Sequence, residues 1–406
     1  MEIALIHYAA PPIIGGVESV IDSHSRLLAD DGHHVRIIAG RGEQIDPRIP
    51  FTKLPLVDSR HENILALKKD LDQGRIPQGF DSIVQEIKSQ LIEIIGNTDW
   101  LIAHNVCSLN KNLALTAALK QMSQDQTKPQ IILWHHDLAW TTPRYRDELH
   151  DGYPWDLLST DWPQAKQVVV SESRQIELEK LLNVNNGRIN VVPNGIDSAY
   201  FWKLELQTQE IYTRLDLISA DPLLLLPVRI TPRKNIEFAL KVLAELCKRF
   251  KNARLVVTGP LGPHNPTNVE YLKRLVELRR ELNIEGSAYF LAELIDRPLS
   301  NEVISDLYRL SDLLLFPSLE EGFGIPILEA GLAGIPVFCA DIAPFRELGG
   351  SQVTYFSLDI GPSDLATQLI KSLESSSVFA LRKRVLQNYS WEKIYTHKIA
   401  PLLKKG

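Results

Sequence analysis

The stretch "DLLLFPSLEEGFGIPILEAGLAG", residues 312–334, indicates the fold class of the chain. It opens with an apolar run that is typical of a buried strand. From Pro326 onward it has the composition of a helix, and proline suits the first helical turn because its missing N–H is not needed there. The stretch therefore predicts a strand, a glycine-containing loop and a helix in direct succession.

The same succession recurs along the chain. Further apolar runs typical of buried strands are "IALIHYA" (3–9), "HVRIIAG" (34–40), "DWLIAHN" (99–105), "QIILWHHD" (130–137), "QVVVSES" (167–173), "LLLLPVR" (223–229), "ARLVVTGP" (253–260), "AYFLAEL" (288–294), "IPVFCAD" (335–341) and "TYFSL" (354–358). Amphipathic helical patterns lie between them, for example at 17–30 and 234–250. This alternation predicts an α/β fold with parallel sheets covered by helices on both faces.

Length and composition limit the possibilities. A chain of 406 residues fits two domains of about 200 residues each, and the weakly periodic segment 197–221 is the expected boundary. The net charge of -6, with acids and bases interspersed, argues against nucleic acid as a partner. The three cysteines form no C-x-x-C pair, and no basic leader or long apolar stretch is present, so we expect a soluble cytoplasmic protein.

The loop of the opening stretch has the chemistry of a sugar-nucleotide site. Gly322 and Gly324 expose backbone N–H groups, and the N-terminus of the following helix favours a phosphate. Carboxylates accept hydrogen bonds from hydroxyls, so Glu321 and Glu329 suit a sugar ring and a ribose on either side of a diphosphate. The alternative for either glutamate alone is a surface loop followed by an acidic first helical turn.

This stretch resembles the E-x7-E motif of the retaining, family-4 glycosyltransferases, which have the GT-B fold. The likeness extends from the Gly-Gly loop at 15–16 to "SWEKI" at 390–394. It implies that Glu321 contacts the donor sugar and Glu329 the ribose hydroxyls. It also implies donor contacts from the loop residues Gly322, Phe323, Gly324 and Ile325.

The resemblance implies a reaction and a role for each of the two domains. The reaction is transfer of a hexosyl unit, glucose or mannose, from a UDP- or GDP-sugar to an acceptor hydroxyl, with no metal or other cofactor. Residues 1–200 would form the Rossmann-like acceptor-side domain and 201–387 the Rossmann-like donor domain, facing each other across a cleft. A last helix, at about 388–406, would pack back on the first domain.

Two cations are expected to hold the departing diphosphate. Arg229 and Lys234, in "PVRITPRKN", follow a predicted buried strand, and two fixed cations can replace a metal there. They match the Arg/Lys pair of the family. The alternative is a solvated basic loop. Arg233 lies in the same loop, so position after the strand does not by itself show which of these basic residues bind a ligand.

Three further strand ends complete the predicted site. Gly15 and Gly16 follow the first strand, where the family's loop approaches the donor phosphate. In "LWHHDLAW" we prefer His136 over His135 as the residue near the reacting sugar, because it directly precedes Asp137. Backbone groups of Leu294 and Ile295 match the family's nucleobase contact.

The long connection at 141–163 is rich in aromatic residues and prolines. Arg144, Tyr145 and Arg146, with Tyr153 and Trp155, either bind the acceptor or pack the loop onto its own domain. The first reading would suggest an anionic acceptor. The D-x-D pair Asp70 and Asp72, which binds a cation in glycosyltransferases of another fold, lies in a charged helical pattern and is interpreted as solvated.

Two other functions fit the same two-domain fold. A sugar-nucleotide epimerase or hydrolase would need no acceptor other than water. A non-catalytic scaffold would have kept the fold without the chemistry. A dehydrogenase is disfavoured because "IIGGVES" is not a G-x-G-x-x-G fingerprint. The sequence does not indicate an oligomeric state.

Overall fold

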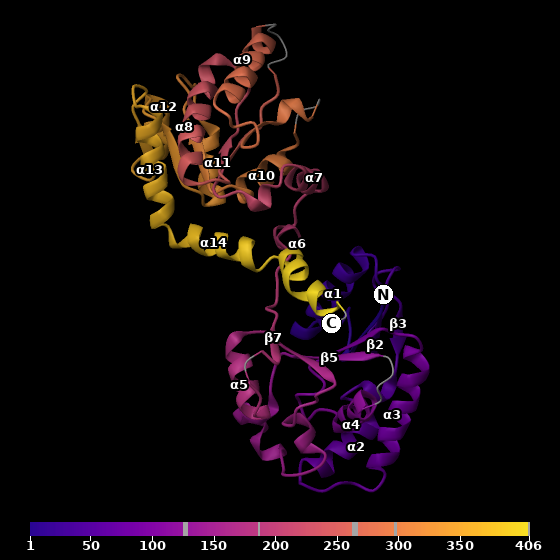
Figure 1. Ribbon diagram of the computed structural model, residues 1–406. Helices are drawn as coiled ribbons and strands as arrows, with labels where there is room; N and C mark the ends of the chain where they lie inside the picture. Colours follow the sequence, from indigo (N-terminus) through magenta and orange to yellow (C-terminus); the bar gives the residue numbers. More distant parts are fainter. Residues whose placement is uncertain (125–128, 186, 262–266, 296–298, 405–406) are drawn as a thin grey trace. The chain divides into compact units, whose positions relative to one another are not determined.

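The chain forms two domains. The computed structural model describes residues 1–406 except 125–128, 186, 262–266, 296–298 and 405–406. Domain 1 comprises Met1–Gly195 and Trp391–Gly406, and domain 2 comprises Ile196–Ser390 (Figure 1). The boundary expected after residue 200 falls within helix α6 (Ser198–Trp202), and the expected return at 388 lies at the end of the helix before Trp391.

Domain 1 is built on one parallel sheet of seven strands, in the order β3-β2-β1-β4-β5-β6-β7. These strands are β1 (Glu2–Ala9), β2 (His34–Arg41), β3 (Phe51–Lys53), β4 (Trp100–His104), β5 (Gln130–His135), β6 (Ala165–Val169) and β7 (Ile189–Val191). The strand order reverses between β1 and β4, so this domain is doubly wound, and ligands in such sheets bind where the order reverses.

The helices of domain 1 cover both faces of the sheet. They are α1 (Gly16–Asp30), α2 (Glu62–Leu71), α3 (Phe80–Ile95), α4 (Leu113–Gln124) and α5 (Glu172–Leu182). Alternate residues of β1 point to opposite faces: Ile3 and Leu5 join the core beneath α1, and Ala4 and Ile6 join the core beneath α3 and α4. Burial on both faces explains why this strand reads as a continuous apolar run.

The C-terminal segment differs from the single helix that the pattern at 388–405 predicts. Helix α14 (Ser377–Asn388) ends first, and helical structure resumes only in α15 (Trp391–Ile394), a π-helical turn (Tyr395–Ile399) and α16 (Ala400–Leu402). The helix is interrupted because Ile196 N donates to Tyr389 O at 2.7 Å and Ile196 forms a β-bridge with Ser390. Lys405 lies outside the described residues. Trp391 is buried in domain 1, and the C-terminal segment lies beside α1 (Figure 1).

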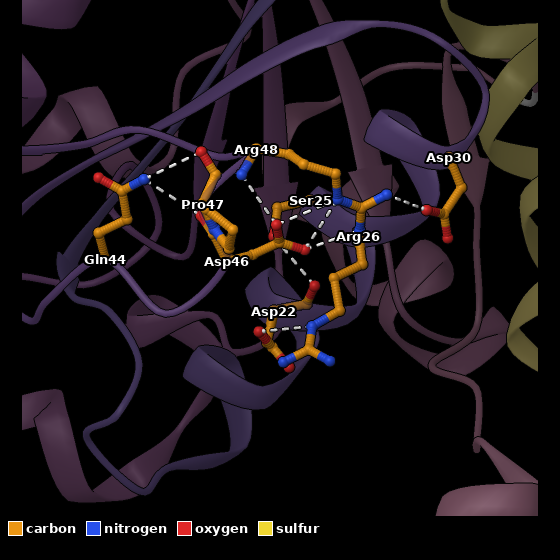
Figure 2. A network of polar contacts seen from close by, with 8 residues as sticks. All are labelled: Asp22, Ser25, Arg26, Asp30, Gln44, Asp46, Pro47 and Arg48. Carbon is orange, nitrogen blue, oxygen red and sulfur yellow. Dashed lines mark hydrogen bonds and ion pairs between the residues drawn. The ribbon is translucent and has the colours of Figure 1, made fainter. Parts of the chain in front are cut away.

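A network of ion pairs ties the loop between β2 and β3 to α1. Arg48 is held by both carboxylate oxygens of Asp46, and its Nη1 lies 2.7 Å from Asp30 Oδ1 (Figure 2). Asp30 is the last residue of α1, so the side chain of Arg48 joins the loop to the end of this helix. One turn earlier, Asp22 pairs with Arg26 at 3.1 Å.

Domain 2 repeats the architecture with a parallel sheet of six strands, in the order β10-β9-β8-β11-β12-β13. Its strands are β8 (Leu223–Leu226), β9 (Arg254–Val257), β10 (Ala288–Phe290), β11 (Leu313–Phe316), β12 (Val337–Ala340) and β13 (Thr354–Phe356). Its helices after α6 are α7 (Leu206–Arg214), α8 (Ile236–Arg249), α9 (Thr267–Glu281), α10 (Asn301–Leu310), α11 (Ile325–Ala333), α12 (Ala343–Gly349), α13 (Pro362–Ser375) and α14. Here the strand order reverses between β8 and β11.

The predicted fold class, two Rossmann-like doubly wound α/β domains, is confirmed. The pattern missed β3 and β7, two strands of three residues each at the edges of one sheet. No helix within the described residues is long and apolar enough to span a membrane.

Candidate functional site

Two of the predicted donor residues, Lys234 and Glu321, meet where the strand order of domain 2 reverses. The loop after β8 carries Lys234, and the loop after its sheet neighbour β11 carries Glu321. The Lys234 ammonium donates a hydrogen bond to Glu321 Oε1, and Ser318 Oγ donates to the same oxygen at 3.1 Å. The two loops are also joined through their backbones, because Leu319 N donates to Arg233 O at 2.9 Å.

This ion pair is largely shielded from water. The side chains of Lys234 and Glu321 are each 10% exposed. Breaking a buried pair by removing one partner is costly because an uncompensated charge remains. The pair therefore fixes a cation and a carboxylate side by side at the carboxyl ends of the strands.

The structure places the two arginines of this loop but does not test their predicted roles. Arg229 follows the buried Val228 and has an exposed side chain, so its contact with the diphosphate stays a prediction. Arg233, which the sequence could not assign, lies with Nη1 3.7 Å from Glu321 Oε2. Gly259 was also missed: a Cβ there would lie 1.8 Å from Val228 O, so only glycine lets the β9 loop pass this close to Arg229.

The glycine-containing loop leads into α11 as predicted, with Pro326 in the first turn. Gly324 has a φ of +112°, which favours glycine, and a Cβ there would lie 2.9 Å from the Phe345 ring. Gly322 faces open space, so its close approach to a ligand stays a prediction. Phe323 and Ile325 expose large apolar side chains beside the loop.

Glu329 lies on α11 and accepts a hydrogen bond from the hydroxyl of Tyr308, Oη to Oε2, at 2.7 Å. Tyr308 is buried on α10, and burial together with the hydrogen bond to Glu329 raises its pKa, so its hydroxyl remains a donor. Both side chains line a pocket of about 260 Å³ between α10 and α11, with Asn301, Ser305 and Arg309. No pattern in the sequence indicates Tyr308, because Glu329, which it contacts, is 21 residues away.

The predicted nucleobase contacts follow β10. The N–H groups of Leu294 and Ile295 both donate to Leu291 O, at 3.0 and 2.9 Å. A nucleobase here would therefore contact the carbonyl oxygens of these two residues. Asp296, which directly follows them, lies outside the described residues.

In domain 1, the structure separates the roles of the two consecutive histidines after β5. His135 is buried, and its Nε2 lies 2.7 Å from Gln167 Oε1 on β6. His136 is only half-buried, and its Nε2 lies 3.5 Å from His104 Nδ1. Burial lowers the pKa of His136 to about 4, although Asp137 opposes this effect, so the imidazole is neutral at neutral pH.

Three more buried histidines, His7, His24 and His104, lie in the same domain as His136. Burial lowers the pKa of His7 to about 4 and that of His24 to about 3, and it takes the pKa of His104 well below its usual value. His24 on α1 packs its ring against those of Trp134 and Trp391. Neither nitrogen of the His24 ring has a hydrogen-bond partner among the described residues.

The remaining predicted residues of domain 1 lie in two loops. Gly15 is the N-cap of α1 and Gly16 its first residue, and the Glu18 side chain lies against Gly15. In the connection at 141–163, Trp155 is buried and Tyr145 packs against the domain core. Arg144 and Arg146 are exposed, with the Arg144 guanidinium 4.7 Å from the centre of the Tyr145 ring. Tyr145 and Trp155 thus pack the loop onto its own domain, whereas Tyr153 is exposed with its ring edge-to-face against Phe80, and the two arginines face solvent.

The acidic D-x-D pair has ordinary ion-pair partners. Asp70 pairs with Arg75 at 2.7 Å and Asp72 with Lys68 at 2.6 Å, as expected for a solvated helix surface. Within the residues that the structure describes, no group of three or more histidine, cysteine or acidic side chains is placed to hold a metal ion.

Two family models match the chain. The family model "Glycosyltransferase Family 4" matches residues 14–200, and "Glycosyl transferases group 1" matches residues 208–389. Together these two matches cover most of both domains.

Curated relatives match over most of their length. The chain is 27% identical to mannosylglucosylglycerate synthase of Petrotoga mobilis, over 86% of this chain and 84% of the relative. It is 24% identical to the MMP alpha-(1->4)-mannosyltransferase of Mycolicibacterium hassiacum, over 98% and 97%. The solved structure of WaaG, a glycosyltransferase of lipopolysaccharide biosynthesis, aligns over 100% of both chains at 18% identity, with a TM-score of 0.35, which is too low to support an inference.

Proposed function

Because the chain belongs to the family-4 glycosyltransferases, we propose that it transfers a glucosyl or mannosyl unit from a UDP- or GDP-sugar to an acceptor hydroxyl. In this proposal the anomeric configuration is retained and no metal is needed. The observation that carries the proposal is the shielded Lys234–Glu321 pair where the strand order of domain 2 reverses.

The charges of this site suit a nucleoside diphosphate sugar. Lys234 and the exposed Arg229 supply positive charge for the diphosphate, and Glu321 supplies acceptor oxygens for the sugar hydroxyls. Glu329, oriented by Tyr308 beside a pocket, suits the ribose hydroxyls. Phe323 and Ile325 offer apolar surface to the sugar.

In this proposal, catalysis rests on placement and on stabilisation of the departing diphosphate. The bond between the anomeric carbon and the diphosphate breaks through an oxocarbenium-like state, the acceptor oxygen attacks from the same face, and the proton of the acceptor hydroxyl passes to the departing diphosphate oxygen. His136 is neutral at neutral pH and offers a hydrogen-bonding imidazole to the reacting sugar without adding charge. The cations of Arg229 and Lys234 perform the role that a metal has in other glycosyltransferases.

The relatives suggest the first substrates to test. Mannosylglucosylglycerate synthases of two bacteria match over more than four fifths of this chain, so we propose GDP-mannose as donor and glucosylglycerate as acceptor for the first assays. Glucosylglycerate carries a carboxylate, and the exposed Arg144 and Arg146 suit an anionic acceptor. A cytoplasmic location, where sugar nucleotides are made, remains part of the proposal.

Thermal stabilisation by nucleotides tests the proposal. The purified protein is heated with UDP, GDP, UDP-glucose or GDP-mannose, each with and without EDTA. A ligand at 100 times its dissociation constant stabilises the folded state by about 2.7 kcal/mol, which gives a measurable shift in Tm. We expect one nucleotide series to shift Tm equally with and without EDTA.

The outcomes separate the alternatives. Loss of the shift in EDTA would contradict the metal-independent site, and no shift with any nucleotide would support the non-catalytic scaffold. Where a nucleotide binds, release of nucleoside diphosphate from the sugar nucleotide without an acceptor would favour a hydrolase. Release that requires glucosylglycerate would support transfer.

A further inference from the structure

Asn105 directly follows β4 and stands beside the end of β5, where His136 lies. In the sheet His104 is the register partner of Trp134, and Asn105 N donates to Trp134 O at 2.7 Å, which is the last backbone hydrogen bond of this ladder. Beyond that point the N–H groups of the first two residues after β5 are bound by the side chain of Asn105 and not by backbone carbonyl groups. Its Oδ1 accepts from both His136 N and Asp137 N, each at 3.0 Å.

The NH₂ group of the same amide binds the neighbouring carboxylate of Asp137. Asn105 Nδ2 donates to Asp137 Oδ2 at 3.3 Å, and Ser108 Oγ donates to Asn105 Oδ1 at 3.3 Å. One buried side chain thus fixes two backbone N–H groups and one carboxylate of the segment that carries His136.

Asparagine meets three demands at this position. The backbone φ of Asn105 is +55°, a left-handed conformation that asparagine and glycine tolerate better than other residues. The two N–H groups need an oxygen acceptor, and Asp137 needs a donor. Glycine satisfies only the first demand, aspartate lacks the donor, and only asparagine satisfies all three.

We propose that Asn105 is the positioning residue of the reaction centre in domain 1, which holds His136 and Asp137 in the arrangement that presents the His136 imidazole to the reacting sugar. His136 Nε2 also lies 3.5 Å from Nδ1 of His104, the residue before Asn105. Because Asn105 holds the backbone of His136 next to the end of β4, it also holds the two imidazole rings at this distance. The catalytic consequence rests on the proposed function, whereas the positioning itself does not.

The positioning is tested without substrate, by NMR of the ring nitrogens in protein labelled with ¹⁵N-histidine. His136→Asn identifies the His136 signals by their loss. Asn105→Gly keeps the left-handed backbone but removes the amide, and we expect it to shift or broaden the His136 ring signals. The signals of His135, which is held by Gln167, should stay in place.

A matched control removes another asparagine of the same kind. Asn183 caps the C-terminus of α5 in domain 1 with a φ of +51°, so Asn183→Gly is the same change at a distant site. It should leave the His136 signals unchanged. The positioning role is wrong if the His136 signals of Asn105→Gly coincide with those of the unaltered protein.

A double-mutant cycle tests the catalytic consequence, with GDP-mannose and glucosylglycerate as substrates. Misplacement of a reacting group by about 1 Å can lower the rate by about 100-fold, so we expect Asn105→Gly to lower kcat by about 10- to 100-fold and to affect KM less. If Asn105 acts through His136, the double variant is no slower than His136→Asn alone. Multiplicative losses would overturn that route.

The proposed function and this inference fail in different ways. If His136→Asn turns over normally, the assigned role of His136 is wrong, whatever the NMR shows. If His136→Asn is slow but Asn105→Gly moves neither the His136 signals nor kcat, the positioning role of Asn105 is wrong and the proposed function stands.

Discussion

Replacing His24 by phenylalanine should make domain 1 more resistant to acid. The ring of His24 is 1% exposed, and its centroid lies 4.6 Å from that of Trp134 and 5.1 Å from that of Trp391. Phenylalanine keeps these edge-to-face contacts. It also removes two buried ring nitrogens that have no hydrogen-bond partner among the described residues.

The sign and size of the effect follow from proton binding. Burial lowers the pKa of His24 from 6.5 in the unfolded chain to about 3 in the folded one, with a smaller contribution from His136. Below pH 6.5 the unfolded chain therefore binds a proton that the folded chain does not. Well above pH 6.5, proton binding by His24 does not change the free energy of unfolding. Well below pH 6.5, the free energy of unfolding falls by about 1.4 kcal/mol for each further pH unit, until the folded ring titrates.

Urea unfolding at pH 7.5, 6.5, 5.5 and 5.0, followed by tryptophan fluorescence, measures this effect. Six of the seven tryptophans lie in domain 1, so the signal reports mainly on that domain. The free energy of unfolding of the His24→Phe variant, minus that of the unaltered protein, should grow by about 1.4 kcal/mol between pH 7.5 and 5.5. A difference that does not change with pH would refute the reasoning, even if the variant is more stable throughout.

Three other predictions concern domain 2. Lys234→Ala should lower kcat by about 100- to 1,000-fold, because a fixed charge at the leaving group is lost; circular dichroism checks the fold, and normal turnover by a folded variant would contradict the assignment. Tyr308→Phe removes a hydrogen bond to the Glu329 carboxylate, worth about 1.5 kcal/mol, and should weaken nucleoside diphosphate binding about tenfold in calorimetry; equal affinity would remove Glu329 from the ribose site. Gly324→Ala forces a φ of +112° on alanine and should cost about 1–3 kcal/mol in urea unfolding. The control Gly331→Ala, inside α11 with no atom near the new methyl, should be neutral or stabilising.

The sequence predicts the fold well where burial dominates. β1, β8 and β11 are covered on both faces, so their apolar runs are continuous and easily recognised. β3 and β7 have only three residues each and are defined by their pairing with distant strands. The C-terminal helix was predicted to begin at about residue 388, whereas it begins at Trp391, because Tyr389 and Ser390 pair with Ile196 instead.

The candidate site was predictable where a short motif carries the chemistry. Lys234 and Glu321 stand in recognisable loops after predicted strands, and Glu329 stands in the predicted helix that follows; the structure brings Lys234 and Glu321 together. The doublet of His135 and His136 could not be resolved by pattern, because only burial and the contact with Gln167 distinguish the two rings. Asn105 gave no signal, since a positive φ and hydrogen bonds to residues 31 and 32 positions away are invisible in the sequence.

The return of the chain to domain 1 has a consequence for synthesis on the ribosome. Trp391, Ile394, Ile399 and Leu403 are buried in the same core as Ile3, Leu5 and Val20. Domains generally fold in the order of translation, yet here the first core stays incomplete until residues beyond 390 have emerged. Domain 2, which is continuous in the sequence, is complete earlier. The unfinished face of domain 1, including the surface beneath Trp391, must therefore stay unaggregated while almost 200 further residues are made.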